Sequence, residues 1–251
     1  MTKARRRSRD RQIARFSEAD IQLADTLDSL DDSVAYTSWI FDLVEPFLGP
    51  KVLEVGAGHG TFTELLARAG RTVVASDLSD RCVSVLEDRF SESPDVEIIS
   101  GSIDAASGRG PFDAAVLINV LEHIEDDRGA LRQLASLLEP GGRVILWVPA
   151  FELLYSDFDR RIGHHRRYRL PGLRDRISLA GLEVLDIRYV NPIGAIGWFV
   201  IARVLGRDPV GGAPARIFDR YLVPLLEGVE RRVRPPFGQS IFVSAKRPVD
   251  P

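Results

Sequence analysis

Three glycines alternate with other residues in the segment Glu54-Val55-Gly56-Ala57-Gly58-His59-Gly60. The segment comes directly after an apolar run at residues 51–55 and directly before a helix-like stretch at residues 61–69. Glycine lets a backbone turn tightly and approach a ligand, and the first turn of a helix presents unpaired N–H groups. The sequence therefore predicts that this turn binds a nucleotide-type ligand.

Two carboxylates accompany the glycine turn and narrow the choice of ligand. Its G-x-G-x-G spacing differs from the G-x-G-x-x-G of dinucleotide sites, and Glu54 suits an ammonium group better than a pyrophosphate. Asp77 lies about 20 residues further on, where a carboxylate can accept both ribose hydroxyls. The alternative role of Asp77 is to cap the next helix together with Ser79. S-adenosylmethionine has the ammonium group and lacks phosphates, so it fits both carboxylates.

Histidines, acids, arginines and tyrosines lie close together in residues 155–168, shortly after the apolar run at residues 143–148 that is the fifth predicted strand. Methyl transfer chiefly requires alignment of the acceptor with the methyl group, but a hydroxyl acceptor also needs a base, for which histidine is suited at neutral pH. His164 in this loop and His123 after the fourth strand are the candidates, and His123 could instead position the pocket. The other interpretation of the loop is a charged segment held by salt bridges.

Short apolar runs alternate with helix-like stretches from residue 51 onward, a pattern typical of a parallel sheet with helices on both faces. The expected strands are 51–55, 72–76, 96–100, 114–118, 143–148, 183–189 and 240–246, and the expected helices are 61–69, 79–90, 127–138, 171–180 and 217–233. We expect one domain at 31–251, with a core at 51–149, a lid and acceptor region at 150–239, and a final strand at 240–246. Residues 1–30 are expected to form a basic, disordered arm, which could instead contact phosphate or anionic lipid.

The segment from 51 to 149 resembles the class I S-adenosylmethionine-dependent methyltransferases, since it carries the glycine turn, the acid after the second strand, the stretch 112–124 and the turn 138–142. The resemblance implies a Rossmann-like, mostly parallel sheet of seven strands, with an antiparallel last strand and lid insertions after strands 5 and 6. It also implies a cofactor site made of Glu54, Gly56, Ala57, Gly58, Gly60, Asp77, Leu78, Ser102, Ile103, Asn119, Val120 and Tyr36, the last closing over the methionine end. Members often carry an acid where Ser102 stands, and this chain departs from them there.

The loop at 155–168 is similar to a "D…GH-x-R-R-Y" stretch found in a bacterial subgroup of these enzymes, related to the type 11 and type 12 methyltransferases. That similarity favours His164 over His165 as the base. It also implies an acceptor pocket that contains Tyr155, Arg166, Arg167 and Tyr168.

Composition and motifs exclude several partners. The net charge of −3 gives no general attraction to nucleic acid, and Asn119-Val120-Leu121-Glu122 stands where base-amine methyltransferases have Asn-Pro-Pro-Tyr. The single cysteine, Cys82, provides neither a disulfide nor a cysteine cluster, and Asp157 and Asp159 alone do not make a metal site. We therefore expect a soluble, cytoplasmic protein that binds no nucleic acid and no metal.

The apolar segment 192–205 is too short to cross a membrane, which takes about 20 residues. We expect it to form a lid or a subunit contact in a homodimer, and the alternative is peripheral contact with a membrane.

The predicted function is O-methylation of a small molecule or of a glycan or glycolipid intermediate. The alternatives are an N-methyltransferase of a small molecule, a methyltransferase fold that only binds, and an NAD-dependent oxidoreductase.

Overall fold

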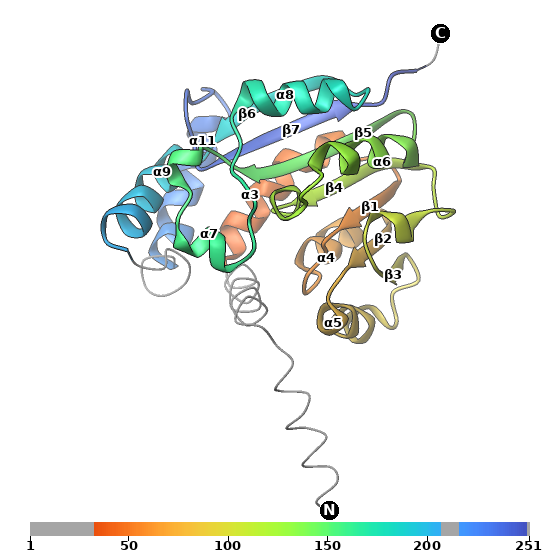
Figure 1. The fold of residues 1–251 in the computed structure, drawn as a ribbon. Helices are drawn as coiled ribbons and strands as arrows, with labels where there is room; N and C mark the ends of the chain where they lie inside the picture. The colour runs from red at the N-terminus through yellow and green to blue at the C-terminus, as the bar shows by residue number, and fades with distance from the viewer. Residues whose placement is uncertain (1–32, 207–215, 250–251) are drawn as a thin grey trace, which may run out of the picture.

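The strands form one seven-stranded sheet in the order β3-β2-β1-β4-β5-β7-β6 in the computed structural model, which describes residues 33–206 and 216–249 (Figure 1). The strands are β1 (Lys51–Val55), β2 (Thr72–Asp77), β3 (Val96–Ser100), β4 (Phe112–Ile118), β5 (Leu138–Pro149), β6 (Glu183–Val190) and β7 (Ser240–Lys246). Strands β1 to β5 pair in parallel, and β7 runs antiparallel to both β5 and β6. The predicted Rossmann-like sheet with an antiparallel last strand is confirmed. The arm predicted at residues 1–30 lies outside the described residues.

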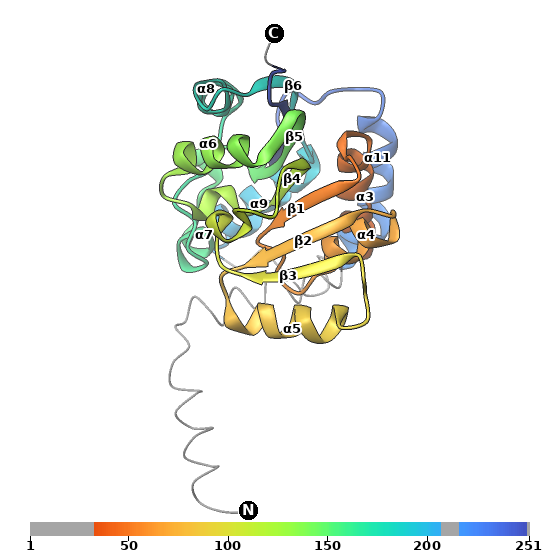
Figure 2. The same ribbon diagram turned by 90° about the vertical axis from the view of Figure 1, so that its right-hand side faces the viewer.

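Helices cover both faces of the sheet, as Figure 2 shows. One face packs against α6 (Asp127–Leu137) and α8 (Leu170–Leu179), and the other packs against α3 (Val34–Val44), α4 (Thr61–Arg68), α5 (Asp80–Phe90) and α11 (Val223–Glu230). Successive strand residues point to opposite faces, so in β4 Ala115 and Leu117 join the first layer while Ala114 and Val116 join the second. This double burial explains why the central strands are continuous apolar runs.

Short 3-10 helices follow several strands and bring their next residues to the carboxyl edge of the sheet. They are η2 (Ile103–Ala106), η3 (Leu121–His123) and η4 (Glu152–Leu154), and the short helix α7 (Asp157–Arg161) follows η4. A further 3-10 helix, η1 (Glu45–Phe47), lies between α3 and β1. Because η3 and α7 follow β4 and β5, two separate chain segments meet at one end of the sheet.

The boundary between α6 and β5 differs from the prediction. The sequence predicts a helix to residue 138 and a strand from 143, but β5 already begins at Leu138, which pairs with Phe112. A register shift between Phe112 and Ala114 accommodates the additional residues. A side chain at Gly142 has no room there, because its Cβ would lie 2.9 Å from the carbonyl oxygens of both Glu139 and Phe112.

The segment between β6 and β7 forms a helical layer beside α3. It comprises α9 (Pro192–Trp198), the π-helical turns η5 (Phe199–Val204) and η6 (Phe218–Leu222), and then α11. The carboxylate of Asp219 in η6 accepts hydrogen bonds from the backbone N–H groups of Ala35 and Tyr36, at 3.3 and 2.8 Å. This layer is therefore fastened to the first turn of α3. Within the described residues, no helix has the length and apolar character needed to span a membrane.

We predict that Gly142→Ala lowers the free energy of unfolding by about 1–3 kcal/mol, the usual cost of overpacking a filled site. Gly197→Ala in α9 is the matched control, because nothing lies within 4 Å of the Cβ that it adds. Chemical denaturation of both variants measures the difference. Equal stability of the two variants would show that β5 can shift to admit the methyl group.

Candidate functional site

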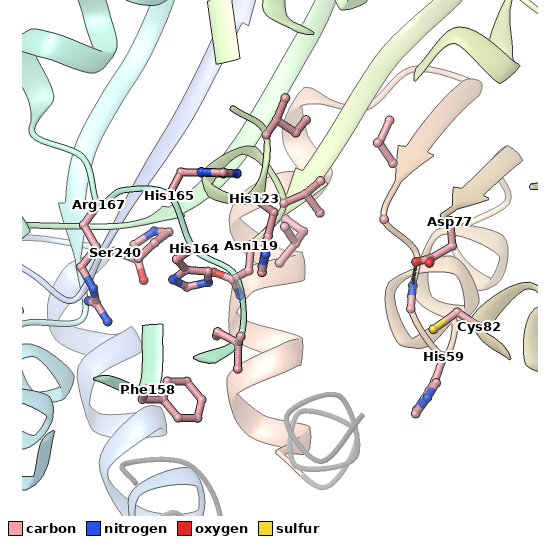
Figure 3. Close-up of a pocket in the computed structure, with 18 of the residues that line it drawn as sticks. His59, Asp77, Cys82, Asn119, His123, Phe158, His164, His165, Arg167 and Ser240 are labelled. Carbon is pink, nitrogen blue, oxygen red and sulfur yellow. Dashed lines mark hydrogen bonds between the residues drawn. The ribbon is translucent and has the colours of Figure 1, made fainter. Parts of the chain in front are cut away.

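A large cavity lies at the carboxyl ends of β1, β2, β4, β5 and β6, with a volume of about 2220 Å³. Ligand sites usually measure roughly 300–1,000 Å³, so this cavity has room for two molecules side by side. Figure 3 shows Asp77 and His59 on one side and His164, Arg167 and Phe158 on the other, with Asn119 and His123 between them. The described part of the chain thus places most of the predicted cofactor residues and both predicted catalytic histidines around one space.

The glycine turn adopts a backbone that few other residues tolerate. Gly56, Gly58 and Gly60 have φ values of 71°, 57° and 85°, in the left-handed region. The N–H groups of Gly56 and Ala57 donate to the carbonyl of Ser76 at 2.8 and 3.0 Å, which folds the turn over the end of β2. Gly56 and Gly58 line the cavity, as predicted for cofactor contacts, whereas Ala57 and Gly60 lie beneath the turn and do not line it.

Asp77 lines the cavity beside this turn. One carboxylate oxygen accepts from the Gly58 N–H at 2.9 Å, and the other accepts from the Ser79 N–H at 2.8 Å. The residue that caps α5 is Ser79, whose hydroxyl accepts from the Cys82 N–H. Each Asp77 oxygen keeps a further lone pair, so Asp77 can brace the turn and still accept a ribose hydroxyl.

Glu54 is not among the residues that line the cavity, although the sequence predicts a contact with the ligand's ammonium group. The carboxylate is buried and accepts a 2.6 Å hydrogen bond from the Thr63 hydroxyl, which ties β1 to α4. Burial raises the pKa of Glu54 to about 8, so its carboxyl group is mostly neutral at pH 7. The Glu54 carboxyl group thus ties β1 to α4, and its contact with the cofactor stays a prediction.

The other predicted cofactor residues lie along the same edge of the sheet. Leu78, Ser102, Ile103, Asn119, Val120 and Tyr36 all line the cavity. Tyr36 is held edge-on by Trp39 and Trp147, with ring centroids 5.9 and 6.0 Å away, and burial raises the pKa of its phenol to about 12. Asn119 has a left-handed backbone with φ of 54°, which is strained for a residue other than glycine and turns the chain at the end of β4.

His164 lies between two buried carboxylates. Its Nδ1 is 2.9 Å from Asp159 Oδ1, and its Nε2 is 3.7 Å from Glu122 Oε1. Both oxygens of Glu122 lack a hydrogen-bond partner among the described residues, and burial raises the pKa of this carboxyl to about 7. The ring of His123 packs edge-on against that of His164 at 4.6 Å, and burial, with a contribution from His164, lowers the pKa of His123 to about 4. His123 is therefore neutral at physiological pH.

Asp159 is fully buried and has four hydrogen-bond contacts. Ser156 donates from its N–H and its hydroxyl to Oδ2, while Arg167 Nε and His164 Nδ1 contact Oδ1. Burial alone would raise the pKa of Asp159, but the His164 hydrogen bond and the Arg167 charge outweigh it and lower the pKa to about 2. Asp159 is thus an ionised carboxylate inside the protein.

The predicted acceptor residues divide into one that lines the cavity and three that support its wall. Arg167 lines the cavity, with its guanidinium 4.5 Å from the ring centroid of Trp198. Tyr155 donates to the His164 carbonyl, Tyr168 donates to the Leu121 carbonyl and to Asp127, and Arg166 pairs with Asp127. These three residues do not line the cavity, and their contacts hold the loop in place. The Arg166–Asp127 ion pair is of the kind that the alternative interpretation, a loop held by salt bridges, predicts.

Several cavity residues were missed by the sequence analysis. Phe158, Ile162, Asn191, Ile196 and Trp198 lie in α7 and α9 or directly beside them, where ordinary apolar spacing gives no sign of a pocket. Glu122 and Asp159 could have been noticed as acids near His123 and His164. The structure also brings ligand atoms of Glu122, His123 and His164 within 4.8 Å of one another, close enough to share a cation, although the sequence predicts no metal from Asp157 and Asp159.

Comparisons with known proteins identify similar methyltransferases. A family model described as a methyltransferase domain matches residues 4–187. The ubiquinone biosynthesis O-methyltransferase of Thiobacillus denitrificans is 37% identical over 109 residues, which cover 42% of this chain and 47% of that protein. Its counterpart in Xanthomonas axonopodis pv. citri is 40% identical over 101 residues, covering 39% of this chain and 42% of that protein. The chain thus spans less than half of the length of these relatives.

Solved structures share the fold at low identity. A putative methyltransferase from Bacillus halodurans has a TM-score of 0.58 and 17% identity, covering 83% of this chain and 98% of its own. The 1,6-didemethyltoxoflavin-N1-methyltransferase of Burkholderia thailandensis, solved with 1,6-didemethyltoxoflavin and S-adenosylhomocysteine, also has a TM-score of 0.58, with 18% identity and coverage of 89% and 83%. At this identity the likeness concerns the fold alone.

The neutral state of Glu54 predicts a pH effect on stability. Its native pKa of about 8 lies above the ordinary 4.5, so the native state binds the proton more tightly than the unfolded chain does. The stabilisation is complete below pH 4.5 and is lost as the pH rises toward 8. Glu54→Gln keeps an acceptor for Thr63 without the charge. The melting temperature of this variant, relative to that of the wild type, should therefore be higher at pH 8 than at pH 5.

Thermal denaturation at those two pH values measures this gain. Glu87→Gln, which alters an exposed glutamate in α5, is the control and should follow the wild type at both. If the melting temperature of Glu54→Gln also changes with pH as that of the wild type does, Glu54 is ionised in the native protein.

Proposed function

Because the chain belongs to the methyltransferase-domain family, we propose that it transfers the methyl group of S-adenosylmethionine to an oxygen atom of a small molecule. The observation that carries the proposal is the cavity with the glycine turn and Asp77 on one side and the His164 cluster on the other. A cavity of about 2220 Å³ accommodates cofactor and acceptor together.

The cofactor side of the cavity fits S-adenosylmethionine. Gly56 and Gly58 leave the backbone free of side chains beside the ligand, and a Cβ on Gly56 would lie only 2.5 Å from Val120. Asp77 supplies a carboxylate for the ribose, and Ser102 and Ile103 border the adenine side. When bound, the cofactor supplies a methyl group on a positively charged sulfur, which is already an activated leaving group. The residues of this chain then need only to bind and align the acceptor and to accept its proton.

Oxygen is favoured as the acceptor atom by two observations. The matched relatives are named ubiquinone biosynthesis O-methyltransferases, and His164 offers a basic nitrogen on the acceptor side of the cavity. The walls there are largely apolar, with Phe158, Ile162, Ile196 and Trp198 lining them. An apolar small molecule with a hydroxyl group therefore fits better than a polar glycan, although a lipid-linked glycan would also present an apolar part.

His164 takes the acceptor's proton in this proposal, and neutral His123 orients the acceptor or His164 itself. A small-molecule amine is the alternative acceptor, and it would not need a base if it enters the cavity in its neutral form.

We place the reaction in the cytoplasm, where a single cysteine is expected to stay reduced. Segment 192–205 lines the cavity through Ile193, Ile196 and Trp198, which supports its predicted role as a lid.

Cofactor binding is predicted to depend on Gly58 and Asp77. Gly58→Val should abolish binding of S-adenosylhomocysteine, because a β-branched residue is strained at a φ of 57° and would occupy the ligand's path. Asp77→Ala should weaken binding by roughly 10- to 150-fold, the equivalent of one charge-assisted hydrogen bond of about 1.5–3 kcal/mol. Calorimetric titration measures both, with the exposed Asp88→Ala in α5 as control. Unchanged affinity in both variants would exclude this site.

Catalysis is predicted to depend on His164. His164→Ala should reduce methyl transfer by ~10²-fold or more while leaving the affinity for S-adenosylhomocysteine nearly unchanged, because the ring lies on the acceptor side. Release of S-adenosylhomocysteine, measured with a panel of hydroxylated aromatic and lipid-like acceptors, identifies a substrate and then compares the variant with wild type. His165→Ala serves as the neighbouring control. Full turnover in His164→Ala would transfer the role to His123.

A further inference from the structure

The two ring nitrogens of His164 have different surroundings, and one of them is fixed. Nδ1 lies 2.9 Å from Asp159 Oδ1, and Asp159 also accepts from Arg167 and twice from Ser156. An ionised carboxylate can only accept hydrogen bonds, so Nδ1 must carry the proton in this contact. In the neutral ring, Nε2 is then the atom with the free lone pair.

We propose that Asp159 is a positioning residue that holds His164 with its proton on Nδ1, so that Nε2 faces the acceptor as the proton-accepting atom. This inference rests on the proposed function. Asp159 itself touches neither acceptor nor cofactor, since it is fully buried and does not line the cavity. It acts through the orientation and tautomer of the His164 ring.

Arg167 stabilises the ionised form of Asp159 in the protein interior. Its side chain is 1% exposed, its Nε donates to Asp159 at 2.8 Å, and its guanidinium lies over the Trp198 ring. An unpaired buried carboxylate would take up a proton, whereas the paired one keeps its charge. The same arginine lines the cavity, so the clamp on Asp159 also forms part of the acceptor wall.

Glu122 gives the site a second carboxylate for the charged form of His164. Its Oε1 is 3.7 Å from Nε2, and neither of its oxygens is hydrogen-bonded among the residues that the structure describes. When the acceptor's O–H bond breaks, its proton goes to Nε2. The acceptor oxygen gives its electron pair to the methyl carbon, and the carbon–sulfur bond breaks with its pair on sulfur. The imidazolium then lies between the carboxylates of Asp159 and Glu122, which stabilise its charge.

Several other titratable or charged groups face His164. Glu122 and His123 approach from η3, Asp159 approaches from α7, Arg167 bonds to Asp159, and Tyr155 donates to the His164 carbonyl at 2.7 Å. A pH profile of a single variant would therefore mix several effects, so a direct measurement of the tautomer is the primary test.

Nitrogen NMR of the full chain labelled at histidine nitrogens reports which ring nitrogen of His164 carries the proton. We expect protonated Nδ1 and unprotonated Nε2 at the pH where the ring is neutral, with the resonance assigned by its loss in His164→Ala. The opposite tautomer would overturn the proposal. This readout requires neither acceptor nor turnover. If methyl transfer is never found, the proposed function fails while the tautomer assignment is still tested.

Variants of Asp159 test whether the tautomer matters for turnover. Asp159→Asn presents an amide that can donate to Nδ1 and so move the proton to Nε2. We expect kcat to fall on the order of 10²–10⁴-fold, with the acceptor KM and the cofactor affinity nearly unchanged. Asp159→Glu keeps the charge and should recover part of the activity and the wild-type tautomer. Asp157→Asn on the same helix is the matched control, because Asp157 is exposed and pairs only with Arg160 among the described residues.

Two further results would overturn the proposal. One is wild-type kcat in a folded Asp159→Asn variant, checked by its melting temperature. The other is a stoichiometric divalent cation in the purified protein, measured by elemental analysis and lost in His164→Ala. In that case Nε2 would be a metal ligand rather than a proton acceptor. Absence of such a metal, together with the expected tautomer and the loss of kcat, supports the positioning role.

Discussion

Parallel pairing of β1, β2, β4 and β5 is the constraint on which the site depends. Parallel strands all end at the same edge of a sheet, and β6 joins them because β7 runs antiparallel to both β5 and β6. The chain must turn sharply there after each strand. Asn119, Phe151 and Asn191 therefore stand in left-handed conformations just beyond β4, β5 and β6. The cavity is formed by the residues that these turns expose.

Charge pairing inside the loop after β5 is the second determinant of the site. Glu122 and Asp159 are both fully buried carboxyls near His164, yet their pKa values are displaced in opposite directions, to about 7 and about 2. Burial acts on both, but Asp159 receives hydrogen bonds from Arg167, Ser156 and His164, whereas Glu122 receives none among the described residues. The number of hydrogen-bond donors thus decides whether the pKa of a buried carboxyl rises or falls. In the proposed function, His164 is held at Nδ1 by Asp159 and accepts the proton at Nε2.

The sequence reveals the elements better than it reveals the contacts between them. Strands buried on both faces appear as apolar runs, and the glycine turn follows from spacing within seven residues, so both could be predicted. The direction of the Glu54 side chain could not, because it depends on the Thr63 hydroxyl of the following helix. Tyr168 and Arg166 are similar cases, since their partner Asp127 lies about 40 residues earlier in α6. Local patterns carry no information on such pairings.

The two sides of the cavity are held in place by different parts of the fold. The cofactor side consists of turns at the ends of the central strands, which are held by the ladder of the sheet. The acceptor side consists of α7, α9 and the π-helical turns, whose link to α3 includes the two hydrogen bonds to Asp219. Tyr36 lies in the turn of α3 that Asp219 holds, and it lines the same cavity. A change in the helical layer is therefore expected to move Tyr36 as well. In the proposed function, the shape of the acceptor side and the enclosure of the cofactor then both depend on the carboxylate of Asp219.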